Sequence, residues 1–279
     1  MKLLSKSILI LAAALGFWGC NDDEPKPETP LEVLPTNVSA LKEIYKSLDM
    51  DSEGYPVQWN PEDMSTWKNA GITLDTITDE ESQQNYLAVA SITLYLTHKN
   101  DFTPEALLEL SSLKDLKVYA CADSYFNGRM IPASVESLLV DRLNPDDPGY
   151  IIGVPNDKLI LANRKAIFRK LVMHGIDMKS IGCIMSYDAE VDLSHNTLEG
   201  NVPSIFGTML RKSANLSYNK FTGLQWGWEI WSEYNGILSV PNLQNNDFSD
   251  IPDYVFESDF WKEHHENFIG NPGYKAPEQ

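Results

Sequence analysis

The chain has 279 residues, 43% of them hydrophobic, which is enough to build the core of one or two domains. Its 22 Lys and Arg against 40 Asp and Glu give a formal net charge of −18, which argues against nucleic acid and anionic lipid surfaces as partners. The three cysteines, Cys20, Cys121 and Cys183, include no Cys-x-x-Cys pair, so neither a disulfide scaffold nor a structural zinc cluster is supported.

Residues 1–19 have the features of a secretory signal. Lys2 and Lys6 supply the positive start, an apolar stretch covers Ile8 to Leu15, and Gly19-Cys20 ends the segment. The apolar stretch is short for a membrane-spanning helix. A cysteine at this place resembles a bacterial lipoprotein site, which implies lipid attachment at Cys20. The alternative is an ordinary signal peptide with an incidental cysteine.

Residues 20–36 form an acidic, proline-rich tether that is too polar to fold alone. Its start, Asn21-Asp-Asp-Glu-Pro25, resembles the export signal of Bacteroidetes surface lipoproteins. The resemblance implies an outer-membrane, lipid-anchored protein that is exposed at the cell surface. A plain solvated tether is compatible with the same residues.

Residues 37–85 begin with a predicted amphipathic helix over Asn37–Leu48, because apolar residues recur there at helical spacing. A loop-rich stretch over 51–69 contains Trp59 and Trp67, and a short strand is predicted over Gly71–Asp75. Both tryptophans are expected to fill a core rather than to bind a ligand. Asp75-Thr76-Ile77 resembles a Bacteroidetes O-glycosylation tripeptide, and is equally ordinary at the edge of a strand.

Short apolar motifs then recur through residues 86–143. Leu94 is followed after 24 residues by Val118, and Leu138-x-Val140 begins a further copy. The pattern is interrupted over residues 144–166, which start with the turn cluster Asn-Pro-Asp-Asp-Pro-Gly and continue into a brief helical pattern over Ala162–Lys170. This segment is either a loop that leaves the repeat array or one repeat that has lost its pattern.

The best copy of the motif is Val191–Pro203, which reads apolar-x-Leu-x-x-Asn-x-Leu-x-Gly-x-Val-Pro. Its Asn196 is followed by Asn219 after 23 residues and by Asn246 after a further 27, each in the same motif. This order resembles the leucine-rich repeat family, and the Gly-x-Val-Pro ending is similar to its plant-type subclass. The resemblance implies an α/β solenoid with a short parallel sheet on its concave face, capped at both ends.

On this resemblance, residues 37–85 form an N-terminal cap, residues 86–258 form the repeats with an irregular insertion at about 144–166, and residues 259–279 form a C-terminal cap. Asn196, Asn219 and Asn246 then make a structural ladder that binds backbone groups in each bend. Cys121 falls on the same motif position, where it is expected to be a buried and inert thiol.

Strand alternation predicts which side chains point outward from the sheet. The outer column is formed by the residue that follows the second apolar residue of each strand, and contains Tyr95, Tyr119, Asp141, His174, Ser194, Ser217 and Gln244. The inner column is formed by the residue between the two apolar residues of each strand, and contains Thr93, Lys117, Leu139, Val172, Asp192, Asn215 and Asn242. The candidate ligand-binding residues are Tyr95, Lys117, Tyr119, His174, Asp192, Ser194, Asn215, Ser217, Asn242 and Gln244. The alternative is a solvated sheet face without a ligand.

Trp226, Trp228 and Trp231 concentrate aromatic rings in a segment that extends to Tyr234. They either form a platform for a glycan or, as their place after the repeat bend favours, pack on the convex side. The adjacent histidines within Lys262–Glu266 lack the spacing of a metal site. No catalytic motif, metal site or cofactor is predicted.

The leading hypothesis is therefore a non-catalytic cell-surface lipoprotein that recognises a protein or peptide and meets the membrane only through its lipid anchor. The alternative is a glycan-binding accessory lipoprotein of an outer-membrane nutrient-uptake system.

Overall fold

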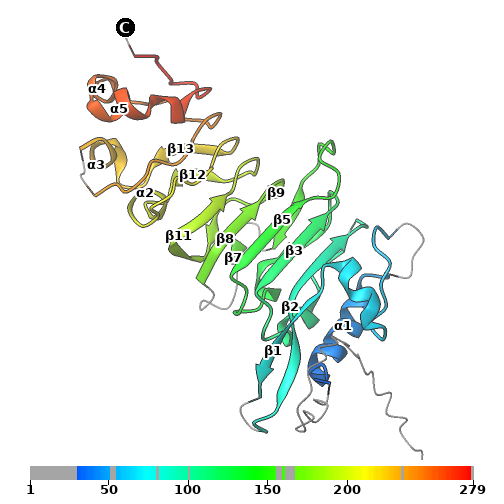
Figure 1. Ribbon diagram of the computed structural model, residues 1–279. Coiled ribbons are helices and arrows are strands. Elements are labelled where there is room, and N and C mark those ends of the chain that lie inside the picture. Colours follow the sequence, from blue (N-terminus) through cyan, green and yellow to red (C-terminus); the bar gives the residue numbers. More distant parts are fainter. Residues whose placement is uncertain are drawn as a thin grey trace, which may run out of the picture.

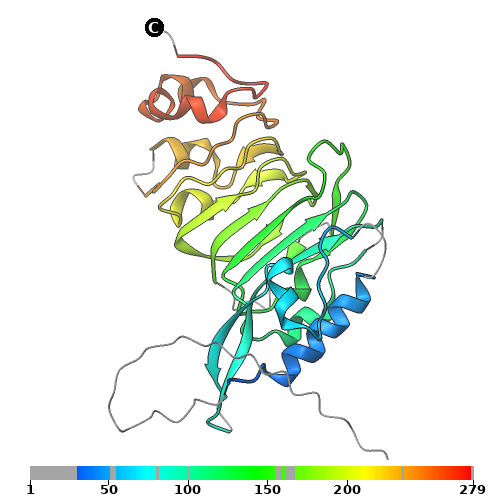
Figure 2. The same cartoon turned by 45° about the vertical axis from the view of Figure 1, so that its right-hand side comes forward.

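The computed structural model describes residues 30–50, 55–79, 82–99, 101–154, 159–160, 167–233 and 236–277. These residues form a solenoid of stacked turns whose strands assemble into one main sheet (Figures 1 and 2). The signal segment, Cys20 and most of the expected tether lie outside the described residues. Within the described part, no helix is both long and apolar enough to cross a membrane.

The solenoid begins with helix α1 (Pro35–Ser47), which is the helix predicted over Asn37–Leu48. A proline in the first helical turn is favourable, since its missing N–H would have no partner there. The 3-10 helix η1 (Met64–Ala70) follows, and the Asp63 carboxylate accepts a hydrogen bond from the backbone N–H of Ser65 at its start. Trp59 and Trp67 are 5% and 3% exposed, which confirms their prediction as core residues.

The main sheet has six strands in the order β1 (Thr73–Thr78), β2 (Asn85–Leu96), β3 (Asp115–Ala120), β5 (Ser137–Arg142), β8 (Ile167–Met173) and β11 (Ile184–Asp192). β1 is antiparallel to β2, and every later pair is parallel. Parallel neighbours must be connected by a crossover, so each turn of the solenoid returns along its outer side before the next strand begins. The predicted fold class, an α/β leucine-rich-repeat solenoid with a parallel sheet, is confirmed.

The inward side of the sheet is a column of apolar side chains, one from each turn. β3 shows why the pattern works, because its buried residues Leu116, Val118 and Ala120 alternate with outward residues. Fully burying one such side chain contributes about 1.5–3 kcal/mol, and only a neighbouring turn can cover it. The column of fully buried residues is Leu94, Val118, Val140, Met173, Leu193, Leu216, Leu243 and Phe268.

In the C-terminal half the strands shorten to single bridges, which join Asp192 to Asn215 and Asn215 to Asn242. The cause is the residue type at this position. The side-chain oxygens of Asp192 and Asn215 accept the backbone N–H groups of Ser194 and Ser217, at 3.0 and 3.3 Å. Such a bond bends the chain two residues after the Asp or Asn, so the strand cannot continue.

A left-handed residue ends the strand region of each later turn. The positions are Gly175, His195, Tyr218, Asn245 and Gly270, with φ between +54° and +83°. For a residue with a side chain this conformation is uncommon. The rings of His195 and Tyr218 stack at 4.3 Å between centroids and 10° between planes, a contact worth about 0.5–1.5 kcal/mol that offsets the strain.

The outer side of the solenoid is built from short ladders and helical turns (Figure 1). The ladders are β4 (Tyr125–Asn127) with β6 (Ile151–Val154) and β9 (Ile176–Asp177), β7 (Leu159–Ile160) with β10 (Ile181–Gly182), and β12 (Glu199–Val202) with β13 (Lys220–Leu224). The helical turns are η2 (Glu105–Glu109), η3 (Gly128–Met130), α2 (Ile205–Thr208), α3 (Gly227–Glu233), α4 (Asp253–Glu257), α5 (Asp259–His264) and η4 (His265–Phe268).

The interruption over residues 144–166, of which residues 144–154 and 159–160 are described, falls within one enlarged turn of the solenoid, between β5 and β8. β5 and β8 are direct neighbours, with Val140 opposite Met173, so no further strand of the main sheet lies between them. The segment is not a bare loop either, because its strand β6 pairs with both β4 and β9. The helix predicted over Ala162–Lys170 is wrong at residues 167–170, which begin β8, while residues 161–166 lie outside the described part.

Candidate binding face

The outward face of the main sheet carries the two predicted columns in register. Along the inner column Thr93, Lys117, Leu139 and Val172 lie opposite one another on successive strands, and Asp192, Asn215 and Asn242 continue the line. Along the outer column Tyr95 lies opposite Tyr119, and Tyr119 lies opposite Asp141. Of the ten candidate residues, these pairings place Tyr95, Lys117, Tyr119, Asp192, Asn215 and Asn242 along this face.

The ten candidate residues differ in how far their side chains are exposed to solvent. Ser194 and Ser217 are each only 4% exposed, so the prediction that they offer hydrogen bonds to a ligand is wrong. Their hydroxyls point to their own turn, since Ser194 Oγ donates to Asp192 Oδ1 at 2.7 Å and Ser217 Oγ donates to Asn215 Oδ1 at 2.8 Å. Gln244 is also engaged, because its Nε2 donates to the backbone carbonyl of Glu266.

The N-terminal part of the face is aromatic. Tyr95 and Tyr119 stack with 5.6 Å between ring centroids and 20° between planes. Tyr55 meets Tyr95 edge-on at 6.1 Å, and its hydroxyl donates to the Tyr95 carbonyl at 3.2 Å. Burial raises the pKa of both Tyr55 and Tyr95, so these phenols stay neutral. Tyr55 was not predicted, because it belongs to a stretch without strand alternation.

The middle of the face is apolar. Leu139 and Val172 lie side by side on β5 and β8 and are only half-buried, although both are aliphatic. Lys117 is exposed on the neighbouring strand and forms no ion pair with any residue in the described ranges. The stacked Tyr95 and Tyr119 of the outer column lie on β2 and β3, and Leu139 and Val172 of the inner column lie on β5 and β8. These four side chains therefore form a strip that crosses four strands. We call Tyr95, Tyr119, Leu139 and Val172 the apolar strip.

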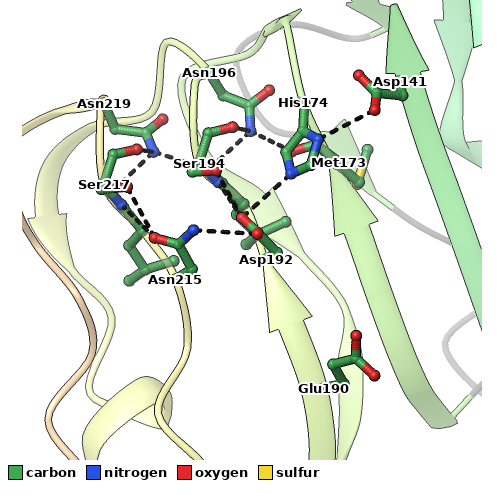
Figure 3. A network of polar contacts seen from close by, with 12 residues as sticks. Asp141, Met173, His174, Glu190, Asp192, Ser194, Asn196, Asn215, Ser217 and Asn219 are labelled. Carbon is green, nitrogen blue, oxygen red and sulfur yellow. Dashed lines mark hydrogen bonds and ion pairs between the residues drawn. The ribbon is translucent and has the colours of Figure 1, made fainter.

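The C-terminal part of the face is a fixed polar network (Figure 3). His174 lies between two carboxylates, with its Nδ1 3.4 Å from Asp141 Oδ2 and its Nε2 3.3 Å from Asp192 Oδ1. The first contact is a hydrogen bond, whereas the second lacks hydrogen-bond geometry and is an ion pair. Asn215 Nδ2 extends the network by donating to Asp192 Oδ2 at 3.1 Å.

The charges in this network are mutually stabilised. The carboxylates of Asp141 and Asp192 raise the pKa of His174 to about 9, against the opposing effect of burial. Burial alone would raise the pKa of each aspartate, but the contact with His174 and further hydrogen bonds outweigh it and lower both pKa values. At neutral pH the network is therefore one cation between two anions.

Behind the face, asparagine side chains join successive turns. Asn219 Nδ2 donates to the carbonyls of Leu193 and Leu216 at 2.8 and 3.1 Å, and its Oδ1 accepts the N–H of Leu198 at 3.1 Å. Asn196 and Asn246 repeat this pattern in their own turns. These amides satisfy buried backbone groups that the bends leave without a strand partner.

Asn271 makes the same contacts at the C-terminal end, although the sequence prediction did not include it in the ladder. Its Nδ2 donates to the Leu243 and Phe268 carbonyls, and its Oδ1 accepts the N–H groups of Asn246 and Phe248. The signal was available, because Asn271 follows Asn246 by 25 residues.

Cys121 occupies the corresponding position three residues after Val118, but it is partly exposed rather than buried as expected. Its main chain joins the turn, since its N–H donates to the Leu96 carbonyl and its carbonyl accepts Ser124 Oγ. Burial nevertheless raises the pKa of its thiol, and burial raises the pKa of Cys183 to about 12. Both are free thiols.

The three tryptophans do not form one platform. Trp228 and Trp231 are 8% and 1% exposed, and Trp231 Nε1 donates to the Gln225 carbonyl at 2.9 Å. Only Trp226, at 56%, is open to solvent, while Tyr234 lies outside the described residues. Packing on the outer side is therefore right for two of the three rings, and a three-ring glycan platform is wrong.

Comparison with known proteins gives a distant likeness to a solved structure. No family model matches the chain, and no curated protein matches it. The chain is similar to the crystal structure of the LRR ectodomain of the receptor kinase SOBIR1 from Arabidopsis thaliana, with 17% sequence identity and a TM-score of 0.35. The match covers 69% of this chain and 84% of that chain. The fold assignment rests on the strand register and the asparagine contacts described above.

Proposed function

We propose that the protein is a non-catalytic binding protein whose sheet face holds an extended segment of a protein or peptide partner. The apolar strip is the observation that carries this proposal. Its four aromatic and aliphatic side chains lie in two neighbouring columns of one open sheet face, the tyrosines in the outer column and Leu139 and Val172 in the inner one. Covering them with a partner removes apolar surface from water.

The dimensions of the strip fit a short extended segment. Neighbouring strands lie about 4.8 Å apart, so the three intervals from β2 to β8 span about 14 Å. An extended chain advances about 3.3 Å per residue, so about four or five residues of a partner cross the strip.

The polar network beside the strip supports binding without rearrangement. His174, Asp141, Asp192 and Asn215 are already held by contacts within the protein, so little conformational entropy remains to be lost when a partner docks. Lys117, which has no ion-pair partner in the described part of the chain, adds one positive charge beside the tyrosine pair.

Peptide display on the purified protein tests the proposal. Selected peptides should bind the Val172→Asp variant at least about tenfold more weakly, because a charge would lie in the middle of the strip. Thr222→Asp, at an exposed position of the outer strand β13, is the matched control and should bind like the wild type. Equal affinity of the selected peptides for the wild type and Val172→Asp would sink the proposal.

The alternative is binding of a glycan by an accessory protein of a nutrient-uptake system. The Tyr95–Tyr119 stack is the feature that favours it, since aromatic rings can also cover a sugar. A glycan array with the wild type and Tyr119→Ala distinguishes the two. Sugar binding that requires Tyr119, with no peptide selected, would replace the peptide proposal by this one.

We further propose that lipid attached at Cys20 anchors the protein in the outer membrane with the solenoid at the cell surface. The support is the apolar stretch Ile8 to Leu15 followed by Gly19-Cys20 and the acidic tether. Cys20→Ala should move the protein out of the membrane fraction, and protease added to intact cells should cleave the wild type. Continued membrane retention of Cys20→Ala would exclude the lipid anchor.

A further inference from the structure

One row of outward side chains on the main sheet carries opposite charges at its two ends. Lys117 lies opposite Leu139, Leu139 lies opposite Val172, and Val172 lies opposite Asp192. Paired residues of neighbouring strands point to the same face of a sheet, so these four side chains stand side by side on β3, β5, β8 and β11. We call this set the charged row. It has a cation at one end, two aliphatic side chains in the middle and a carboxylate at the other end.

The cationic end of the row is open. The Lys117 side chain is exposed, and it forms neither a hydrogen bond nor an ion pair in the part of the chain that the structure describes. Asp115 lies two residues earlier on the same face of β3 but does not pair with it. Lys170, by contrast, pairs with Glu190 at 3.0 Å. Lys117 therefore keeps its charge available to a partner, although the protein has a net charge of −18.

The anionic end of the row can accept one more hydrogen bond. Asp192 Oδ1 accepts the N–H and the hydroxyl of Ser194 and lies 3.3 Å from His174 Nε2 (Figure 3). Oδ2 accepts a single hydrogen bond, from Asn215 Nδ2 at 3.1 Å. A carboxylate oxygen has two lone pairs, and the Asp192 side chain is 33% exposed, so a donor from a partner can reach Oδ2. With Asp141, the network holds two anions for one cation, which favours a cationic donor.

The length of the charged row matches the repeat of an extended chain. Three strand intervals separate Lys117 from Asp192, which is about 14 Å. In an extended segment that lies along the row, every second side chain faces the sheet, at intervals of about 6.6 Å. Side chains i and i+4 of the segment are then about 13 Å apart and reach the two charged ends together. Side chain i+2 falls between Leu139 and Val172.

We infer that the charged row selects partner segments with an acidic, an apolar and a basic residue at alternate positions. The acid pairs with Lys117, the apolar residue covers Leu139 and Val172, and the base donates to Asp192 Oδ2. An extended chain can cross the strands in either direction, so the order of the three residues can be read both ways. Exposed ion pairs add little affinity, but a like charge at either end is repelled, and the row therefore sets specificity and register. The inference rests on the proposed function, because it names the chemistry of the partner held on the same face.

Short peptides with blocked ends test the inference on the full chain. The charged peptide carries Glu, Leu and Lys at alternate positions of a threonine-rich sequence, and the neutral peptide carries Gln in place of both charged residues. Titration followed by the amide NMR signals of the protein should give a Kd on the order of 1 mM for the charged peptide. The neutral peptide should bind about three- to tenfold more weakly, because it loses two ion pairs.

Two variants locate the ends of the bound segment. Lys117→Glu should bind the charged peptide about three- to tenfold more weakly, and should bind a peptide with Lys at both charged positions more tightly than the wild type does. Lys220→Glu makes the same charge change at an exposed position of β13, and as the matched control should leave both affinities unchanged. Asp192→Asn should weaken only the peptides that carry Lys, by about two- to fivefold. It keeps the bend, since Asn215 forms the equivalent bend in the next turn.

Failure of this inference can be told apart from failure of the proposed function. The inference is overturned if the charged and neutral peptides bind the wild type alike, or if Lys117→Glu and Lys220→Glu have the same effect. In either case the proposed function still stands where Val172→Asp weakens every peptide. Peptide binding that Val172→Asp leaves unchanged, or no binding of any peptide up to roughly 10 mM, would overturn both.

Discussion

The asparagine ladder allows one substitution to be worked out bond by bond. Asn219→Leu keeps the side-chain size but removes an acceptor from the Leu198 N–H and a donor from the Leu193 and Leu216 carbonyls. Each carbonyl keeps another amide partner, because Asn196 also donates to Leu193 and Asn246 also donates to Leu216. The loss therefore falls mainly on one group, the buried N–H of Leu198.

A buried backbone N–H without a partner costs about 1–3 kcal/mol, and this is the expected loss in the free energy of unfolding for Asn219→Leu. Asn196→Leu should cost more, up to about twice as much, since it strips both the Ile176 N–H and the Met173 carbonyl. Urea unfolding followed by circular dichroism measures both, and amide hydrogen exchange should show faster exchange at Leu198 in the Asn219 variant.

The matched control is Asn69→Leu, the same chemical change at an exposed amide that donates to the Gln58 carbonyl. Water can replace that bond, so its effect should stay within about 0.5 kcal/mol. If Asn219→Leu unfolded at the same urea concentration as Asn69→Leu, the reasoning from unsatisfied backbone groups would be refuted.

Three further predictions concern the network, the bends and the core. The pKa of His174 is raised from 6.5 to about 9, so its ion pairs stabilise the fold fully below about pH 6.5 and are lost as pH rises through about 9. His174→Gln should therefore unfold more easily than the wild type at pH 6, by up to about 3 kcal/mol, and the two urea curves should converge near pH 10; a constant difference would contradict this. Gly175→Ala should cost about 2 kcal/mol or more in urea unfolding, because Gly175 has φ +68° and an added Cβ would meet the Arg142 side chain. Gly200→Ala, at φ +79° with open space around the added Cβ, measures the cost of the left-handed backbone alone, about 1 kcal/mol. Equal losses of stability in the two variants would show that the Arg142 side chain moves aside without cost. Trp231→Ala should cost about 3–5 kcal/mol in thermal unfolding, since this ring is 1% exposed, whereas an unchanged midpoint would mean that the cavity closes.

Much of the fold is predictable because the repeats are periodic. The spacing of Asn196, Asn219 and Asn246 places the buried leucines without any knowledge of long-range contacts. The start of β8 could not be found in this way. Its residues have a brief helical pattern, and only pairing with β5 on one side and β11 on the other holds them as a strand. That pairing spans the enlarged turn, whose strand β6 also depends on partners in other turns.

The site was predictable in position and less so in detail. Strand alternation gave the two columns, but it could not show that Asp141 and Asp192 both meet His174 from neighbouring strands. The burial of the Ser194 and Ser217 hydroxyls does have a signal in the sequence. An Asp or Asn stands two residues before Ser194 and Ser217, which is the spacing of the bend that buries those hydroxyls.

The split among the tryptophans also follows from elementary geometry. Trp228 and Trp231 are three residues apart in α3 and so share one helix face. Trp226 precedes the helix, has a left-handed backbone and is 56% exposed, so it does not belong to that buried face. Helical spacing alone would have separated the two packing rings from the exposed one.

The hydrogen bonds of the ladder give the solenoid a polarity. The Ile176 N–H is satisfied by Asn196, the Leu198 N–H by Asn219, and the Phe221 N–H by Asn246, so each turn depends on the one that follows it. A chain that emerges N-terminus first, during synthesis or export, therefore ends at each stage in a turn whose backbone N–H has no asparagine acceptor until the next turn forms. Asn271 closes this series by supplying the last acceptor. A chain truncated before Asn271 would therefore leave the buried N–H groups of Asn246 and Phe248 without this acceptor, and the apolar end of the preceding turn uncovered.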